Sequence, residues 1–311
     1  MTMRIVMVVL ALLITFPASA HKRIALTFDD VPRSAGAFFT PDDRTWRLIA
    51  ALKAAKVKQA AFFLNPGRLA EPDGKGGEAR IAAYVGAGHV IANHSFSHQH
   101  LSLASVDNYL ADIDKATIWL KGRKGYRPWF RFPYLDEGAD DKVKRDAIRA
   151  GLRTRGLRNG YVTAESSDWN MENLAKNAVA AGKSLDMAAL RDYYVKLHVE
   201  AADFYDGLAR KTIGRSPAHV MLLHETDIAA LYIGDLVAAL RKDGWEIVTA
   251  DKAYADPIGK AMPDVPSAQG TLIEAMAWQK NLPAPRWYKY NDVKLANTLF
   301  SVEVLKETPK P

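Results

Sequence analysis

The sequence predicts an α/β fold built around a parallel sheet. Short apolar runs of three to five residues alternate along the chain with longer segments that have the apolar spacing of amphipathic helices. Strands that are separated by helices pair in parallel, because the chain crosses back over the sheet between them. The 311 residues, 49% hydrophobic and 25% charged, suffice for one large domain or two small ones, and this composition excludes wholesale disorder.

Each expected element has a local signal. Apolar runs bounded by turn residues or by a helix pattern predict strands at residues 24–28, 60–64, 89–93, 129–132, 220–223 and 246–248. Helical spacing predicts helices at residues 41–56, 78–87, 106–121, 142–150 and 228–241. Pro41 suits a first helical position and Ser105 a helix cap, while Gly88 and Gly151 are expected to end the helices before them.

Two regions look like additions to one domain at residues 21–257 rather than separate domains. Residues 170–215 have a mostly helical pattern, and one long amphipathic helix is expected at residues 187–211 inside this insertion. Residues 258–311 are rich in proline and aromatic side chains and show little clean periodicity. We therefore expect a helical insertion and a C-terminal extension that both pack on the same domain.

Residues 1–20 have the pattern of a signal peptide. Arg4 is followed by an apolar run, Pro17 ends that run, and Ala18-Ser19-Ala20 has the small-x-small form of a cleavage site. The run is shorter than the roughly 20 residues that span a bilayer, although a core helix or a retained anchor is the alternative. We expect cleavage near Ala20, export to the periplasm or the outside, and no stable membrane anchor afterwards.

The amino-acid composition excludes several kinds of site and partner. The chain has no cysteine, which excludes disulfides, a cysteine nucleophile and a cysteine zinc site. The net charge of +7 becomes +6 when Arg4 is removed, and basic residues are dense between Lys142 and Arg158. This stretch is either a solvated helix face or a contact for an anionic envelope polymer. We expect no nucleic-acid partner, because no binding motif is present, and the oligomeric state cannot be predicted.

Polar residues that could act in catalysis or metal binding follow several of the predicted strands. Because the carboxyl ends of parallel strands meet at one edge of a sheet, we expect these side chains to lie close together. The segments, in chain order, are Thr27-Phe28-Asp29-Asp30, His94-Ser95-Phe96-Ser97-His98, Arg131-Phe132-Pro133-Tyr134, Ser167-Asp168-Trp169 and Leu222-Leu223-His224.

His94 and His98 suggest a metal site. On a helical turn their i, i+4 spacing would put both rings on one face. Two imidazoles and one carboxylate form a three-ligand site with open positions, which suits zinc or another divalent ion in hydrolysis. The adjacent Asp29 and Asp30 could divide the work, one as ligand and one as proton acceptor. The same ligand set also occurs in iron oxygenases, and an isolated pair of this spacing is often two surface histidines.

Together these motifs resemble the polysaccharide deacetylases of carbohydrate esterase family 4. The resemblance covers roughly residues 23–257 and includes the run from Gly88 to His94. It implies a distorted, incomplete (β/α) barrel of about seven parallel strands, to which the insertion and the extension are added. Leu135 stands where the third motif of the family usually has glycine.

The resemblance also implies a role for each site residue. Asp29 would be the general base, Asp30, His94 and His98 the metal ligands, and Arg131 the partner that orients Asp29. His224 would be the general acid, paired with Asp168. The backbone N–H of Tyr134 would hold the oxyanion, and Trp169 and Leu222 would line the acetyl pocket.

The function implied is that of a carbohydrate deacetylase, a hydrolase of carbon–nitrogen bonds in linear amides. A water molecule bound to the metal would attack the N-acetyl group of an amino-sugar polysaccharide or oligosaccharide. The ion expected first is zinc, with cobalt, nickel or manganese as alternatives. An O-acetyl esterase acting on a cell-envelope or plant glycan, and a non-catalytic glycan-binding protein on the same fold, remain alternative functions.

Overall fold

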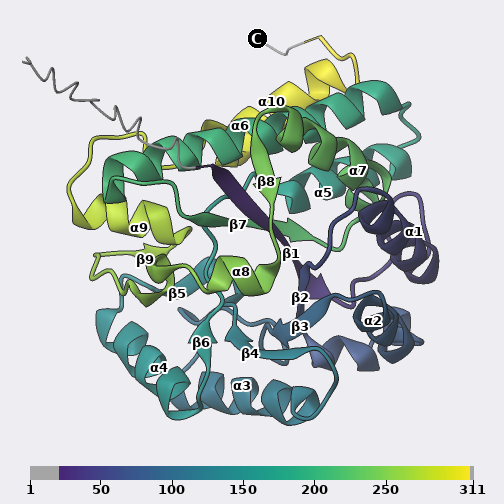
Figure 1. Ribbon diagram of the computed structural model, residues 1–311. Helices are drawn as coiled ribbons and strands as arrows, with labels where there is room; N and C mark the ends of the chain where they lie inside the picture. The colour runs from purple at the N-terminus through teal and green to yellow at the C-terminus, as the bar shows by residue number, and fades with distance from the viewer. Residues whose placement is uncertain (1–20, 309–311) are drawn as a thin grey trace, which may run out of the picture.

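The computed structural model describes residues 21–308, and within them a parallel seven-stranded sheet forms the centre (Figure 1). The strand order is β6-β4-β3-β2-β1-β7, and β8 pairs with the first residues of β1. The strands are β1 (Lys22–Val31), β2 (Ala61–Leu64), β3 (Val90–Asn93), β4 (Tyr126–Phe130), β6 (Arg158–Asn159), β7 (Ala218–His224) and β8 (Trp245–Ile247). The predicted α/β fold is confirmed. The predicted signal peptide lies outside the described residues.

The sheet curls because one segment contacts both of its edges. Arg158 and Asn159 pair in parallel with β4. A few residues later, the N–H of Thr163 donates to the carbonyl of Val220 in β7 (3.0 Å), and the N–H of Leu222 donates to the carbonyl of Ala164 (2.9 Å). The two edge strands are thus bridged by irregular chain rather than by a continuous ladder. This is the distorted, incomplete barrel that the resemblance implied.

Helices surround the curled sheet (Figure 1). They are α1 (Pro41–Ala54), α2 (Gly77–Gly86), α3 (Val106–Leu120), α4 (Lys142–Thr154), α5 (Asp168–Ala180), α6 (Met187–Ile213), α7 (Asp227–Lys242), α8 (Ala250–Tyr254), α9 (Leu272–Gln279) and α10 (Val293–Glu303). Pro41 begins α1, and the Ser105 hydroxyl accepts from the N–H of Asn108 at the start of α3, as predicted.

Gly151 does not end its helix, and that prediction was wrong. Helix α4 continues to Thr154, with Gly151 inside it. A Cβ on Gly151 would lie 2.6 Å from a methyl carbon of Leu110, which belongs to α3. Glycine at this position therefore permits close helix packing, a reason that helical spacing alone does not reveal.

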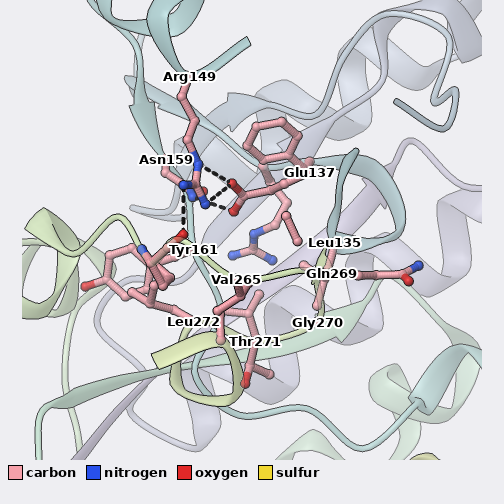
Figure 2. A pocket seen from close by; sticks show the side chains of 16 residues that line it. Leu135, Glu137, Arg149, Asn159, Tyr161, Val265, Gln269, Gly270, Thr271 and Leu272 are labelled. Carbon is pink, nitrogen blue, oxygen red and sulfur yellow. Dashed lines mark hydrogen bonds and ion pairs between the residues drawn. The ribbon is translucent and has the colours of Figure 1, made fainter. Parts of the chain in front are cut away.

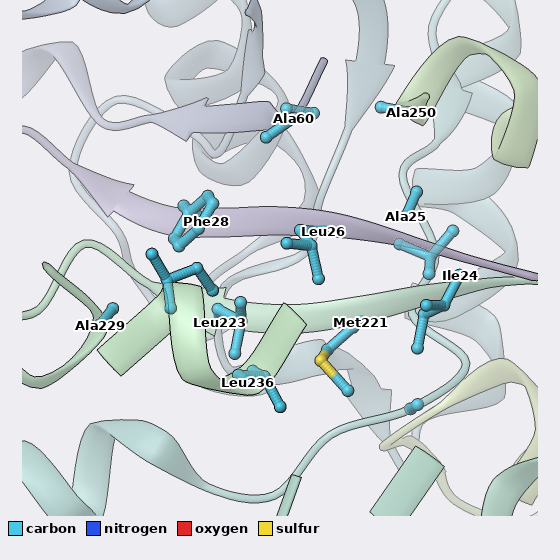
Figure 3. Packing of buried hydrophobic residues seen from close by; sticks show 14 of the residues in the cluster. Ile24, Ala25, Leu26, Phe28, Ala60, Met221, Leu223, Ala229, Leu236 and Ala250 are labelled. Carbon is cyan, nitrogen blue, oxygen red and sulfur yellow. The ribbon is translucent and has the colours of Figure 1, made fainter. Parts of the chain in front are cut away.

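Strand β1 separates two packing regions. Ile24 and Leu26 point away from Ala250, toward which Ala25 points (Figure 3). On the face of Ala25, Thr27 and Asp29 continue the alternation, and the Arg131 guanidinium bonds to both. The interior of the barrel thus becomes polar toward the carboxyl end of β1, where the site lies. Both regions are nearly free of solvent, since Ile24, Ala25 and Leu26 are fully buried.

The additions to the barrel are more regular than the sequence indicated. The long helix predicted in the insertion is α6, which extends to Ile213. The extension contains α9, α10 and β9 (Ala268–Gln269), and β9 pairs antiparallel with β5 (Asp136–Ala139). The hydroxyl of Tyr193 on α6 donates to the carbonyl of Ala296 on α10 (3.0 Å). Across residues 21–308, no helix is both long and apolar enough to cross a membrane.

Much of the basic stretch is neutralised by the protein itself. Arg149 forms an ion pair with Glu137 (2.7 Å) beside a small cavity of about 30 Å³ under the extension (Figure 2). Three more cations of the stretch have carboxylate partners: Lys142 and Arg145 contact Asp264, and Arg155 contacts Asp114. Fewer charges are therefore free for an anionic polymer than the sequence suggests, and that partner stays a prediction.

Candidate active site

A cleft of about 780 Å³ opens beside the carboxyl end of β1. Ligand sites usually have volumes of roughly 300–1,000 Å³. Most of the site residues expected from the sequence line this cleft: Asp29, Asp30, His94, His98, Tyr134, Trp169, Leu222 and His224. Arg131 and Asp168 lie behind them, almost fully buried, and contact Asp29 and His224 respectively. The fold therefore brings the five sequence segments together.

Asp30, His94 and His98 form a candidate metal site. One ligand atom from each residue lies within 4.8 Å of the others. Oδ1 of Asp30 is buried and receives no directed hydrogen bond from residues 21–308, although Nε2 of His98 lies 2.9 Å away. Nδ1 of His94 lies 2.9 Å from the carbonyl of Arg131, which can only accept, so Nδ1 carries the proton and Nε2 presents its lone pair. This donor set fits a divalent cation.

The two histidines meet through a loop, so the expectation of a helical turn was wrong. Ser95 and His98 have φ of 66° and 56°, in the left-handed region. The loop is held by side chains: Asn65 donates to the carbonyl of His94, and Asp112 accepts from the N–H groups of Phe96 and Ser97. The His94 and His98 ring centroids lie 4.9 Å apart as a result.

Burial and neighbouring charge shift the protonation of these groups in different directions. Burial favours the neutral form of Asp30, but the adjacent His98 outweighs it and holds the pKa of Asp30 well below its ordinary value. Burial, together with the charge of His98, keeps the pKa of His94 well below its ordinary value. An ionised Asp30 and a neutral His94 are the forms that bind a cation.

Asp29 lies beside this trio and faces a buried cation. Nη1 of Arg131 contacts its two carboxylate oxygens at 2.9 and 3.1 Å, and Nη2 of Arg131 donates to Thr27 and Tyr254. Asp30 has φ of 68°, which breaks the strand alternation and lets both carboxylates approach His94. Burial raises the pKa of Asp29, and the charge of Arg131 opposes this rise without cancelling it.

His224 and Asp168 form a second pair. Nδ1 of His224 and Oδ1 of Asp168 lie 2.7 Å apart, and the other oxygen of Asp168 accepts from the His224 backbone N–H at 2.7 Å. Burial alone would lower the pKa of His224, but the Asp168 carboxylate outweighs burial and raises it. Burial alone would raise the pKa of Asp168, but the charge of His224 outweighs burial, so the pKa of Asp168 lies below its ordinary value. The pair favours a protonated imidazole at the cleft.

A family model described as polysaccharide deacetylase matches residues 17–155. Residues 17–155 are thus similar to the polysaccharide deacetylase family, over less than half of the chain. The matched segment contains Asp29, Asp30, His94, His98 and Arg131, whereas Asp168 and His224 lie beyond it. The resemblance inferred from the motifs is thus confirmed.

Curated proteins and solved structures are also similar to this chain. The peptidoglycan-N-acetylglucosamine deacetylase of Bacillus cereus is 31% identical over 121 residues, which are 39% of each chain. That of Listeria monocytogenes, PgdA, is 25% identical over 242 residues, 78% of this chain and 41% of the relative. The chain spans about two fifths of the length of these curated relatives. A family 4 carbohydrate esterase from Streptomyces lividans, solved with acetate, matches with a TM-score of 0.49 at 21% identity, covering 76% of this chain and 97% of that one.

The loop after β4 holds an exposed aromatic ring at the cleft. Tyr134 and Leu135 have φ of 58° and 52°, so Leu135 is left-handed at the position where the family usually has glycine. The left-handed conformation costs a non-glycine residue about 1–2 kcal/mol. His100 stacks on Tyr134 with ring centroids 3.5 Å apart, and Nδ1 of His100 lies 3.4 Å from the buried Asp136. These contacts hold the tyrosine ring at the rim.

One wall of the cleft consists of residues that the sequence did not predict. Glu165, and Gln269, Glu274, Trp287 and Asn291 from the extension, line it together with the expected residues. No motif marks them, because they gather only when the extension folds back onto the barrel. Arg33 was also missed; its Nη1 lies 2.9 Å from Oδ2 of Asp30, on the side of that carboxylate away from His98.

Proposed function

We propose that the protein is a metal-dependent hydrolase that removes N-acetyl groups from an amino-sugar polysaccharide or oligosaccharide. The observation that carries this proposal is the Asp30–His94–His98 trio in one cleft with a carboxylate, Asp29, and an acid-forming pair, Asp168–His224. The names of the curated relatives support an N-acetylglucosamine polymer of the cell wall as substrate.

Asp30, His94 and His98 would hold the ion, and zinc is proposed first because the site combines imidazoles with a carboxylate. A divalent ion at such a site polarises the acetyl carbonyl and lowers the pKa of water. Asp29 accepts the proton of the water molecule as its oxygen adds to the carbonyl carbon. Arg131 contacts both oxygens of Asp29 and thereby fixes the direction in which this carboxylate accepts.

His224 completes the reaction from the other side. As the carbon–nitrogen bond breaks, the protonated imidazole gives its proton to the leaving nitrogen, and acetate and a free amine result. Asp168 keeps the imidazole charged and oriented for this step. The backbone N–H of Tyr134 stabilises the negative oxygen, a type of contact worth about 3–4 kcal/mol. Trp169 and Leu222 border the space for the acetyl methyl group.

The experiment is acetate release from acetylated chito-oligomers, peptidoglycan and acetylxylan, with and without a chelator. We expect chelator-sensitive release from an amino-sugar substrate. Asp29→Asn should retain zinc and lose about 10²–10⁴-fold in turnover, the usual contribution of a general base. Release from acetylxylan alone would indicate an O-acetyl esterase, and no release from any of the three would contradict hydrolysis.

We also propose that the protein acts outside the cytoplasm. The support is the signal-peptide pattern of residues 1–20. Expression with its native leader, followed by fractionation and N-terminal sequencing, should give a mature chain that begins at His21. An uncleaved chain in the cytoplasm would contradict export.

A further inference from the structure

The cleft continues past the catalytic groups toward the C-terminal extension. Gln269, Glu274, Trp287 and Asn291 of the extension line it. The extension is anchored there, because β9 pairs with β5 and the N–H of Leu272 donates to the carbonyl of Val162 (2.9 Å) in the segment that bridges the sheet. The outer part of the cleft is therefore a fixed part of the fold.

Hydrogen bonds join distant segments beneath this outer part. The Asn291 amide donates to Oε1 of Glu165 (2.6 Å) and to the hydroxyl of Tyr205 (3.0 Å). Tyr205 in turn donates to Oε1 of Glu274 (2.5 Å), whose other oxygen accepts from the N–H of Thr271 (2.8 Å). Because the insertion, the bridging segment and the extension all contribute, the polar side chains are held in place before a ligand arrives.

The ligand chemistry follows from the side chains that remain open to the cleft. Trp287 is 49% exposed and lines this cleft. Among residues 21–308, the other tryptophan that lines the cleft is Trp169. A sugar ring has an apolar C–H face and a polar hydroxyl edge, so an indole beside carboxyl and amide groups matches both. The volume of about 780 Å³ also exceeds what one acetyl group needs.

We propose that the C-terminal extension forms a sugar-binding subsite, with Trp287 against the ring of the sugar unit next to the one that loses its acetyl group. Glu165, Glu274 and Gln269 face the hydroxyl edge of that unit. This subsite rests on the proposed function for its substrate class. It makes the protein selective for oligomers over single sugars, because a single sugar held at the catalytic groups leaves the outer part of the cleft empty.

The test compares Trp287→Ala with Trp46→Ala. Trp46 is a matched control because it is 62% exposed on α1 and does not line the cleft. Binding of the tetramer of N-acetylglucosamine to metal-free full-length protein is measured by calorimetry, and kcat/KM is measured for the tetramer and for N-acetylglucosamine itself. We expect Trp287→Ala to weaken tetramer binding and to lower its kcat/KM by about tenfold or more, the loss typical of an aromatic side chain that contributes strongly to binding. Trp287→Phe, which keeps a ring, should restore most of both.

The two readouts separate this proposal from the proposed function. Tetramer binding that depends on Trp287, without acetate release by any variant, would support the subsite and contradict the hydrolase. Acetate release with tetramer binding and kcat/KM unchanged in Trp287→Ala would overturn the subsite and leave the hydrolase intact. An equal loss for the tetramer and the single sugar would also overturn it, because a subsite for the neighbouring unit acts only on oligomers.

Discussion

Replacement of Glu274 by Gln should remove a pH dependence of stability that is built into the extension. Burial, together with the charge of Glu165, raises the pKa of Glu274 from 4.5 to about 8. Between these two pH values the folded protein keeps a proton that the unfolded chain has lost. The contribution of Glu274 to folding stability is therefore fully present below pH 4.5 and is lost as the pH rises toward 8.

The size of the effect follows from the pKa difference. Each pH unit between the folded and unfolded pKa values corresponds to about 1.4 kcal/mol, so this one carboxyl should make the fold roughly 4 kcal/mol less stable at pH 8 than at pH 4.5. Glutamine stays neutral throughout. Its oxygen can accept from the N–H of Thr271, as the carboxyl does. Tyr205 donates to the other carboxyl oxygen in the wild type, and the amide that replaces this oxygen can donate to the Tyr205 hydroxyl instead, which reverses the direction of that hydrogen bond.

Urea unfolding followed by tryptophan fluorescence measures this prediction, in chelator so that metal binding does not contribute. Glu274→Gln should match the wild type within about 1 kcal/mol at pH 5 and exceed it by roughly 3–4 kcal/mol at pH 8. Glu246→Gln serves as control, because Glu246 is exposed and pairs with Lys252 at the surface. Equal pH dependence in wild type and Glu274→Gln would refute the reasoning.

Three further predictions concern the proposed metal ligand His98 and the residues that position the proposed acid and base, Asp168 and Arg131. His98→Ala should weaken zinc affinity by more than about 100-fold, because loss of a residue that only hydrogen-bonds to a metal ligand already costs about 10–100-fold. A metal titration that shows unchanged affinity would exclude His98 as a ligand. Asp168→Asn should lower the pKa of His224, because the carboxylate that raises this pKa is removed. The alkaline limb of the pH profile of kcat/KM should therefore move to lower pH. An alkaline limb at the same pH as in the wild type would argue against His224 as the acid. Arg131→Met should leave Asp29 buried without its cation and destabilise the protein by about 3–5 kcal/mol in urea unfolding, and a change below about 1 kcal/mol would show that another group compensates.

The sequence predicted the strand ends well because their signals are local. The apolar run before Asp29 and Asp30 and the run before His224 each form a parallel strand, and parallel pairing places their carboxyl ends side by side. In the register of β1 and β7, Asp29 is the Cα partner of His224. An expected base and an expected acid, almost 200 positions apart in the chain, are thus brought together by strand order alone.

The loop geometry could not be predicted from spacing. The i, i+4 separation of His94 and His98 suggested a helical turn, but left-handed residues and the side chains of Asn65 and Asp112 shape the loop instead. Asn65 and Asp112 belong to distant segments, so the information that fixes the loop is tertiary. The same holds for Glu274 and Trp287, which become cleft residues only when the extension packs on the barrel.

Leu135 connects these tertiary features to the unusual third motif. A left-handed leucine is costly, and glycine would remove that cost. Leu135 nevertheless lines both the cleft and the small cavity under the extension, where Val265, Ala268 and Gln269 also lie (Figure 2). Each Å² of apolar surface that this side chain removes from water there contributes about 25 cal/mol against the backbone cost. Leucine can therefore replace glycine in a chain whose C-terminal extension covers this loop. Leu135 and the extension both line the same end of the cleft.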